Sequence, residues 1–393
     1  MELTYIFFLL LGATIVIVEL IPAIFSLKKL KLKVIDHLQP ISILIPTRNE
    51  EKIIEKVIRA WLEVRYPKDK EIIFCDHSTD KTPLIIKEWQ KKYPNIRYLY
   101  TDTGSKLGNL LKGAKEAKYP WLVISDADKI PLPEALEKLP KYFNSKLGAL
   151  FGKTIPKKTD SLFRILTSCE MVQKFVDQKF YSLIDSTPYL SFSTCLVKKE
   201  DFINILPKKY IADDVYFAIE LRKKGKRNLF FAESVSKEEY AKDFKELLKK
   251  RIRVSKGSFE IAFSNYFPIL FKKDWGTFGK IVLPLRIFYF LGFDLIYLSF
   301  ILASIFEYLI GRVSLNNLLI FWLWLYILVF LIYFFRNLTL PFTIQYSNWK
   351  FVIFSFLYPL YYFIFFRLLS TFALLIYLFE KLFKIKYEKK YWS

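Results

Sequence analysis

The sequence predicts an α/β domain with a largely parallel sheet, set between an N-terminal membrane helix and a C-terminal block of membrane helices. Long apolar runs lie at both ends of the 393 residues, whereas the middle is rich in Lys, Asp and Glu. Within that middle, short apolar runs alternate with segments of helical periodicity, which is typical of βαβ units. Hydrophobic residues make up 53% of the chain, more than in an average globular protein, and this favours a membrane protein with a soluble insert.

The first expected element is a membrane anchor at residues 1–28. Leu3–Leu27 is apolar apart from Glu19 and is long enough to cross a bilayer core of about 30 Å. It lacks the basic start and the small-residue cleavage site of a signal peptide. Lysines follow it directly, which by the positive-inside rule places the next domain in the cytoplasm. We therefore expect an integral protein of the cell membrane.

The C-terminal block is expected at residues 281–380, after an interfacial connector at 259–280. It contains three apolar stretches: Ile281–Ile310, Leu318–Phe335 and Phe351–Phe379. Three simple crossings would put the basic tail, 381–393, on the outer side, against the positive-inside rule, so the number of spans stays open.

Three acids lie inside the apolar stretches: Glu19, Asp294 and Glu307. Buried membrane charges are costly, so these residues are either functional or placed near head groups or against other helices. The formal net charge of +22 does not indicate a nucleic-acid partner, because much of the basic charge flanks the apolar runs, where anionic lipids attract it. The three cysteines have no paired spacing, which argues against disulfides and a zinc site.

The soluble insert, residues 38–258, is expected to hold a parallel sheet. Four buried strands are predicted at Ile41–Ile45, Glu71–Cys75, Ile96–Tyr100 and Trp121–Ser125. Helices are predicted between and after them at Glu51–Glu63, Pro83–Lys92, Leu107–Ala117 and Pro133–Lys141. Ligands of such sheets bind beyond the carboxyl ends of the strands, so functional residues should follow each strand directly.

Polar clusters do follow three of the strands. They are residues 46–51 (Pro-Thr-Arg-Asn-Glu-Glu), residues 76–82 (Asp-His-Ser-Thr-Asp-Lys-Thr) and residues 126–128 (Asp-Ala-Asp). Asn49, Ser78 and Asp80 are also good N-cap residues and could simply start helices. Asp126 and Asp128 are spaced so that both carboxylates can meet one hard cation such as Mg²⁺ or Mn²⁺, which would also hold a diphosphate.

A second acidic pair, Asp213 and Asp214, opens a predicted helix that runs to about Lys224. Acids at a helix N-terminus are favourable in themselves, but a carboxylate there can also act as a general base toward an acceptor hydroxyl. Further along, the run Lys249–Gly257 contains Arg251 and Arg253, either on a solvated helix face or as bidentate clamps for phosphate.

In this order, these motifs resemble glycosyltransferase family two with the GT-A fold. The resemblance covers about residues 41–257 and is strongest to ceramide glucosyltransferase and its relatives. The residues that support it are Asp76-His77, Lys106-Leu107-Gly108-Asn109-Leu110, Asp126-Ala127-Asp128, Tyr210-Ile211-Ala212-Asp213-Asp214 and Arg251-Ile252-Arg253.

The resemblance implies a role for each of these positions. The nucleotide pocket would be lined by Pro46, Thr47, Glu50 and Asp76, and Lys106 would approach the donor phosphates. Asp126 and Asp128 would hold the divalent cation and the sugar diphosphate. Asp214 would be the catalytic base, with Asp213 beside it, and the diphosphate would be covered by Arg251 and Arg253. The reaction would be a single displacement with inversion at the anomeric carbon.

Some positions depart from the family pattern. Cys75 stands where a second acid is usual, and Asp213 replaces the first Glu of the Glu-Asp pair. Val254 replaces the Trp of processive polysaccharide synthases, which weakens the hypothesis of a cellulose- or hyaluronan-type synthase. Residues 190–195 lack the usual glycines of the acceptor loop.

Three hypotheses follow for the function. The first is transfer of a hexose, glucose from UDP-glucose, to a membrane lipid at the cytoplasmic face. The second is a polyprenyl-phosphate glycosyltransferase or polysaccharide synthase. The third, from a different class, is a non-catalytic receptor or transporter subunit that keeps the fold.

Overall fold

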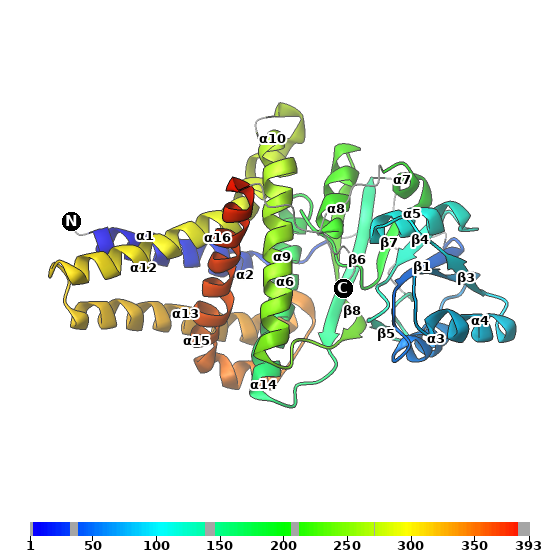
Figure 1. Cartoon of the computed structure of the whole chain (residues 1–393), viewed down its shortest axis with the longest axis horizontal. Coiled ribbons are helices and arrows are strands. Elements are labelled where there is room, and N and C mark those ends of the chain that lie inside the picture. Colours follow the sequence, from blue (N-terminus) through cyan, green and yellow to red (C-terminus); the bar gives the residue numbers. More distant parts are fainter. Residues whose placement is uncertain (1–2, 32–37, 138–145, 206–211, 271, 384–393) are drawn as a thin grey trace. The chain divides into compact units, whose positions relative to one another are not determined.

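The computed structural model describes residues 3–31, 38–137, 146–205, 212–270 and 272–383 (Figure 1). The chain folds into two compact units. The sheet unit comprises, among the described residues, Leu30–Lys158 and Asp185–Glu239. The helical unit comprises Met1–Lys29, Thr159–Ile184 and Tyr240–Tyr387. Both units are therefore built from segments that are discontinuous in sequence.

One eight-stranded sheet forms the centre of the sheet unit, in the order β3-β2-β1-β4-β7-β6-β8-β5. The first four strands are parallel, β7 runs antiparallel to β4 and β6, and β8 is parallel to β6. The bounds are β1 Ile41–Thr47, β2 Lys70–Asp76, β3 Ile96–Tyr100, β4 Trp121–Ile124, β5 Ile130–Pro131, β6 Leu147–Pro156, β7 Cys195–Lys198 and β8 Arg227–Glu238. The four predicted strands are all present, and the sheet is mixed beyond them.

Helices lie on both faces of this sheet (Figure 1). They are α3 Ile54–Glu63, α4 Thr82–Lys92, α5 Lys106–Glu116, α7 Lys199–Ile203 and α8 Asp213–Lys223. The apolar side of α3, which includes Ile54 and Trp61, packs in one buried cluster with Ile43 of β1. On the other face α5 approaches closely, because a Cβ at Gly113 would lie 2.2 Å from Cys75 Sγ. The helix predicted at Pro133–Lys141 is not seen where it is described: 133–137 form turns, and 138–141 lie outside the described residues.

Over the described residues, the helical unit holds four helices that are long and apolar enough to cross a membrane: Leu3–Phe25, Phe278–Leu309, Leu315–Ile344 and Trp349–Leu382. They match the four predicted apolar stretches. Each is helical throughout its length apart from π or 3-10 turns, as at Val16–Leu20 between α1 (Leu3–Ile15) and α2 (Ile21–Phe25). The basic tail beyond residue 383 lies outside the described residues.

Two amphipathic helices complete the helical unit: α6 (Leu162–Ile184) and α9 (Phe244–Ile261). Helix α1 runs beside α12 (Phe293–Leu309), and α9 runs beside α16 (Leu369–Leu382) (Figure 1). The predicted connector at 259–280 consists largely of short helical segments that continue α9. The acids of the apolar stretches, Glu19, Asp294 and Glu307, are at most 1% exposed and contact other helices, as one of the two alternatives predicted.

Candidate active site

The loops after β1 and β2 are tied together at the carboxyl edge of the sheet. Asn49 has a φ of 56°, a left-handed conformation that asparagine adopts more readily than most residues. The main-chain N–H of Asn49 donates to Ser78 Oγ at 2.8 Å, and the side-chain oxygen of Asn49 accepts from the Thr79 N–H at 2.9 Å. The Glu50 N–H donates to Thr82 Oγ1 at 2.9 Å. The possible N-cap residues thus mainly fix one loop against the other.

Asp76, at the end of β2, is fully buried opposite Thr47 of β1. Ser78 Oγ donates to its carboxylate at 2.6 Å, and the Tyr98 hydroxyl lies 3.4 Å away. Burial raises the pKa of Asp76, and the hydrogen bonds from Ser78 and Tyr98 oppose that rise. Pro46 and Thr47 are the last residues of β1 and are also buried. The predicted nucleotide-binding residues therefore meet at one strand edge.

Asp126 and Asp128 follow β4 and face two lysines. Lys106 Nζ lies 2.5 Å from Asp126 Oδ1, and Lys129 Nζ lies 3.5 Å from Asp128 Oδ1. Lys129 also pairs with Glu238 of β8 at 2.5 Å. Burial raises the pKa of Asp126, while Lys106 lowers it. Lys129 was not anticipated from the sequence, because its partner Glu238 is more than a hundred residues away.

The Glu50 carboxylate lies close enough to Asp126 and Asp128 to interact with them electrostatically. Its pKa is raised to about 7, first by burial and then by the negative charges of Asp128, Asp80 and Asp126. The loops after β1, β2 and β4 thus concentrate negative charge at one place. Hard oxygen donors with excess negative charge suit a divalent cation, and Asp126 and Asp128 are the residues that would hold it. Among the described residues, no group of three or more His, Cys, Asp or Glu side chains is arranged as a metal site.

Asp213 and Asp214 begin α8, as predicted, while Tyr210 and Ile211 lie outside the described residues. The Asp214 N–H donates to Asp213 Oδ1 at 3.0 Å, so the pair also serves the helix start. The pKa of Asp214 is raised to about 7 by burial first and by Asp213 second, and Lys106 lowers it. Asp126 contributes as well, which places Asp214 in the same electrostatic cluster.

Lys106 is central to this cluster and is the first residue of α5. Interaction with Asp126, Asp213 and Asp214 raises its pKa despite burial. Its ammonium also lies 5.3 Å from the centre of the Phe192 ring. Phe192 in turn accepts a hydrogen bond from the Asp126 N–H at its main-chain oxygen, at 2.7 Å. Phe192 was missed as a site residue, because only the pairing of β4 with β7 brings residues 190–195 there.

The turn that presents Lys106 depends on Gly108. Ser105 Oγ accepts from the Gly108 N–H at 3.0 Å and caps α5. A Cβ at Gly108 would lie 2.3 Å from Thr103 Oγ1 and 2.9 Å from Thr103 Cβ. We expect Gly108→Ala to cost about 1–3 kcal/mol through overpacking and to weaken donor binding by displacing Lys106.

Thermal unfolding and nucleotide titration would measure both effects of Gly108→Ala. Gly12→Ala is the control, because the nearest atom to its new Cβ would lie 3.9 Å away. Equal unfolding midpoints for the two variants would contradict the predicted crowding.

Arg251 and Arg253 lie on α9 of the helical unit. Arg251 is 5% exposed and pairs with the buried Glu170 of α6, whose carboxylate also accepts from the Tyr361 hydroxyl at 2.7 Å. Arg251 and Lys174 lower the pKa of Glu170 to about 2 against the effect of burial. Arg253 is exposed on the helix surface. That these arginines cover a diphosphate stays a prediction.

Comparison with known proteins agrees with this architecture. The solved mannosyltransferase PcManGT from Pyrobaculum calidifontis, in complex with GDP-Man and Mn²⁺, has a TM-score of 0.67 and 21% identity. The alignment covers 92% of this chain and 98% of that one. The chain thus has the GT-A fold of glycosyltransferases, with apolar helices added at both ends.

Residues 42–206 match the family model Glycosyl transferase family 2. It is 25% identical over 248 residues to Probable glycosyltransferase YdaM of Bacillus subtilis (strain 168), covering 56% of each chain. It is 29% identical over 168 residues to a dolichyl N-acetyl-alpha-D-glucosaminyl phosphate 3-beta-D-2,3-diacetamido-2,3-dideoxy-beta-D-glucuronosyltransferase of Methanococcus voltae, covering 42% of this chain and 50% of that one. The chain spans about half the length of the curated relatives it matches.

Proposed function

We propose that the protein is an inverting glycosyltransferase that moves a hexose from a nucleotide diphosphate donor to a lipid acceptor at the membrane. The observation behind this proposal is the electrostatic cluster of Lys106, Asp126 and Asp214, with Asp128 and Glu50 beside it, at the carboxyl edge of the sheet. It combines a cation for phosphate, carboxylates for a metal ion and, in Asp214 at the start of α8, a carboxylate whose pKa is raised to about 7 and which can act as a base. A pseudoenzyme would have no need to retain all three.

The residues divide into binding and chemical roles. Pro46, Thr47, Glu50 and Asp76 bind the nucleotide, and Lys106 orients the diphosphate. Asp126 and Asp128 would hold Mn²⁺ or Mg²⁺, and the bound cation would supply Lewis acidity to the leaving diphosphate. Asp214 removes the proton of the acceptor hydroxyl, and Asp213 keeps its pKa raised. For Arg251 and Arg253 the resemblance implies a contact with the diphosphate, and in the structure Arg251 pairs with the buried Glu170 of α6.

Glucose from UDP-glucose and a lipid hydroxyl at the cytoplasmic face are the donor and acceptor that we propose first. The resemblance to ceramide glucosyltransferases supports the sugar, and the four apolar helices support an acceptor drawn from the bilayer. The Methanococcus voltae relative is named for a dolichyl N-acetyl-alpha-D-glucosaminyl phosphate, and this favours a polyprenyl-phosphate lipid as the second candidate acceptor. A polysaccharide synthase is a third, since the Poly-beta-1,6-N-acetyl-D-glucosamine synthase of Staphylococcus aureus (strain COL) is 23% identical over 238 residues.

The direct test is purified protein with radiolabelled nucleotide sugars, Mn²⁺ and membrane lipids. A labelled lipid with one added hexose supports the first candidate. Label that is released by mild acid from a long polyprenyl phosphate supports the second, and a long polymer supports the third. Failure to bind any nucleoside diphosphate in the presence of Mn²⁺ would overturn the enzyme proposal in favour of a receptor or transporter subunit.

The pH dependence of turnover should report the base. A general base acts only when deprotonated, and the pKa of Asp214 is about 7 in the folded protein. We therefore expect kcat to rise about tenfold per pH unit below pH 7 and to level off above it. Glu50 also has a pKa of about 7, so the profile of Glu50→Gln separates the two groups. The rise of kcat with pH should persist in Glu50→Gln, because Asp214 is still present. If the rise is lost in this variant, the titrating group is Glu50 and not Asp214.

A further inference from the structure

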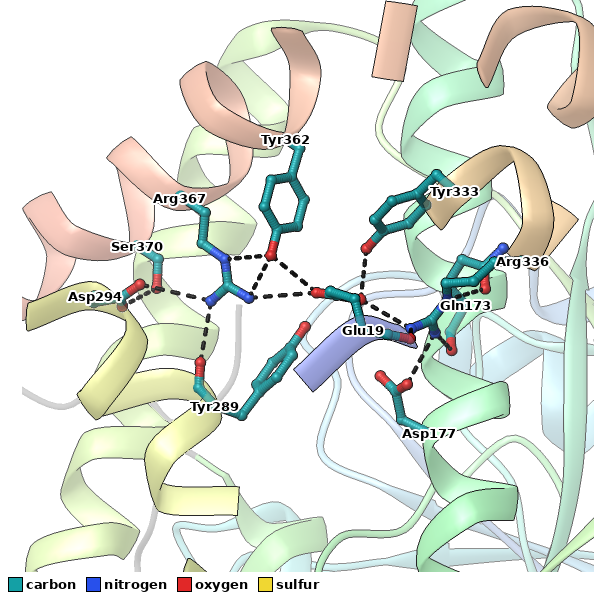
Figure 2. Close-up of polar contacts among 10 residues, drawn as sticks. All are labelled: Glu19, Gln173, Asp177, Tyr289, Asp294, Tyr333, Arg336, Tyr362, Arg367 and Ser370. Atoms are coloured by element: carbon teal, nitrogen blue, oxygen red, sulfur yellow. Dashed lines mark hydrogen bonds and ion pairs between the residues drawn. The ribbon is translucent and has the colours of Figure 1, made fainter. Parts of the chain in front are cut away.

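The helical unit contains a largely buried network of charged and polar side chains between the apolar helices (Figure 2). Its members come from all four candidate membrane helices and from α6. They are Glu19, Gln173, Asp177, Tyr289, Asp294, Tyr333, Arg336, Tyr362, Arg367 and Ser370. The proposed reaction uses none of these residues.

Glu19 lies at the centre of the network and is the one member from the N-terminal helix. Its Oε2 accepts from the Tyr333 hydroxyl at 2.9 Å and from Arg336 Nη1 at 2.9 Å. Its Oε1 accepts from the Tyr362 hydroxyl at 3.0 Å, and Arg367 Nη2 lies 3.5 Å away. Both carboxylate oxygens are thus filled by donors from two other membrane helices.

Each arginine also reaches further carboxylates. Arg336 donates to Asp177 Oδ1 at 2.9 Å and to Gln173 Oε1 at 2.8 Å on α6. Arg367 lies 3.7 Å from Asp294, whose other oxygen accepts from Ser370 Oγ at 2.7 Å. Both guanidinium groups are at most 1% exposed. Glu19 is therefore the carboxylate that the two buried arginines share.

The backbone of the N-terminal helix takes part as well. Arg336 Nη1 donates to the main-chain oxygen of Glu19 at 2.8 Å. Glu19 lies in the π-helical turn Val16–Leu20, just before Pro22, and a proline ring crowds the carbonyl four residues earlier. A π turn of this kind is often found at functional positions. It widens the helix at the residue that the arginines contact.

The N-terminal end of the same helix is held by a second carboxylate, Glu307. The N–H groups of Leu3 and Thr4 donate to Glu307 of α12 at 2.8 and 2.9 Å. These are two of the amides that a helix start leaves without a partner inside the helix. Buried carboxylates thus fix the N-terminal helix at its start and at Glu19 in its second half, through contacts that a generic membrane anchor would not make.

We propose that Glu19 docks the N-terminal helix into the C-terminal helices, so that this helix is an obligatory part of one four-helix membrane core and not an exchangeable anchor. Removing the Glu19 charge leaves Arg336 and Arg367 without their shared counterion in a dry interior, which is more costly than leaving the pair intact. This inference does not depend on which sugar or acceptor the protein uses.

Cysteine cross-linking of the full-length protein in membranes with a short bifunctional thiol reagent tests the proposal. A Cβ at Gly12 would lie 3.9 Å from Leu328 Cδ2, so the cysteines of Gly12→Cys and Leu328→Cys should lie within reach of the reagent and link the N-terminal helix to α13 (Leu315–Ile344). The background carries Ala at the three buried native cysteines. We expect Glu19→Gln to reduce cross-linking at least about fivefold and to lower the unfolding midpoint in detergent by about 5–10 °C.

Lys28→Gln is the matched control, because it removes an exposed charge from the same segment and should leave both readouts unchanged. Glu19→Asp, which keeps the charge, should cross-link more than Glu19→Gln. Wild-type cross-linking and midpoint in Glu19→Gln would overturn the proposal. If Glu19→Gln cannot be purified, Tyr333→Phe and Tyr362→Phe decide: each removes one donor and should lower cross-linking about twofold. Wild-type behaviour of both tyrosine variants would then overturn it.

Discussion

Asp214→Asn should lower kcat by about 10²–10⁴-fold while the nucleotide sugar still binds. The amide keeps the size of the carboxylate and can still accept from the Val215 N–H, as Asp214 Oδ1 does at 2.9 Å. It cannot take a proton from an acceptor hydroxyl. Single-turnover measurement with saturating donor isolates this step from binding, and the ascending limb of the pH profile should vanish together with the rate.

The matched control for Asp214→Asn is Glu220→Gln on the same helix. Glu220 pairs with Lys223 at 2.6 Å on the outer side of α8, and such a partly exposed pair contributes little to stability. We expect Glu220→Gln to retain kcat within about twofold. If Asp214→Asn turns over like wild type, Asp214 is not the base, and its raised pKa reflects burial at a helix start alone.

Asp128→Asn should abolish the metal dependence of nucleotide binding. The side chain of Asp128 is more than half exposed, so its carboxylate is accessible to a cation, and it already attracts the ammonium of Lys129. An amide oxygen is a weaker ligand for a hard cation than a carboxylate. Calorimetric titration of a nucleoside diphosphate with Mn²⁺ should show affinity reduced on the order of 100-fold, or about 2.7 kcal/mol, toward the metal-free value.

Asp160→Asn is an appropriate control for Asp128→Asn. The Asp160 side chain is 59% exposed against 58% for Asp128, and it pairs with one cation, Arg164. Metal-dependent binding should be unchanged in it. Equal nucleotide affinity of Asp128→Asn and wild type, each with Mn²⁺, would remove Asp128 from the metal site and leave Asp126 to be tested in the same way.

The sequence was most informative where local pattern and burial coincide. The strands β1 to β4 were predicted to within one or two residues at each end, because each is an apolar run bounded by polar clusters. The parallel order then placed Glu50, Asp76 and Asp126 at one sheet edge. The four apolar helices were equally clear, because span length is a simple consequence of bilayer thickness.

The features that could not be predicted depend on contacts between distant segments. Phe192 reaches Asp126 through the antiparallel pairing of β7 with β4, and Lys129 finds Glu238 on β8. Nothing local in residues 162–184 indicated that α6 packs with the membrane helices. For Glu19 the sequence offered two readings, and only the partners Arg336 and Arg367 decide between them.

The interleaving of the two units has a practical consequence for anyone who wants a soluble fragment. The chain passes from one unit to the other near residues 29, 158, 184 and 239, so trimming both termini cannot separate them. A fragment of residues 38–258 would carry α6 and α9 stripped of their neighbours, with Asp177 lacking Arg336 and Glu170 lacking Tyr361. Biochemistry on this protein therefore calls for detergent or nanodiscs and the uncut polypeptide.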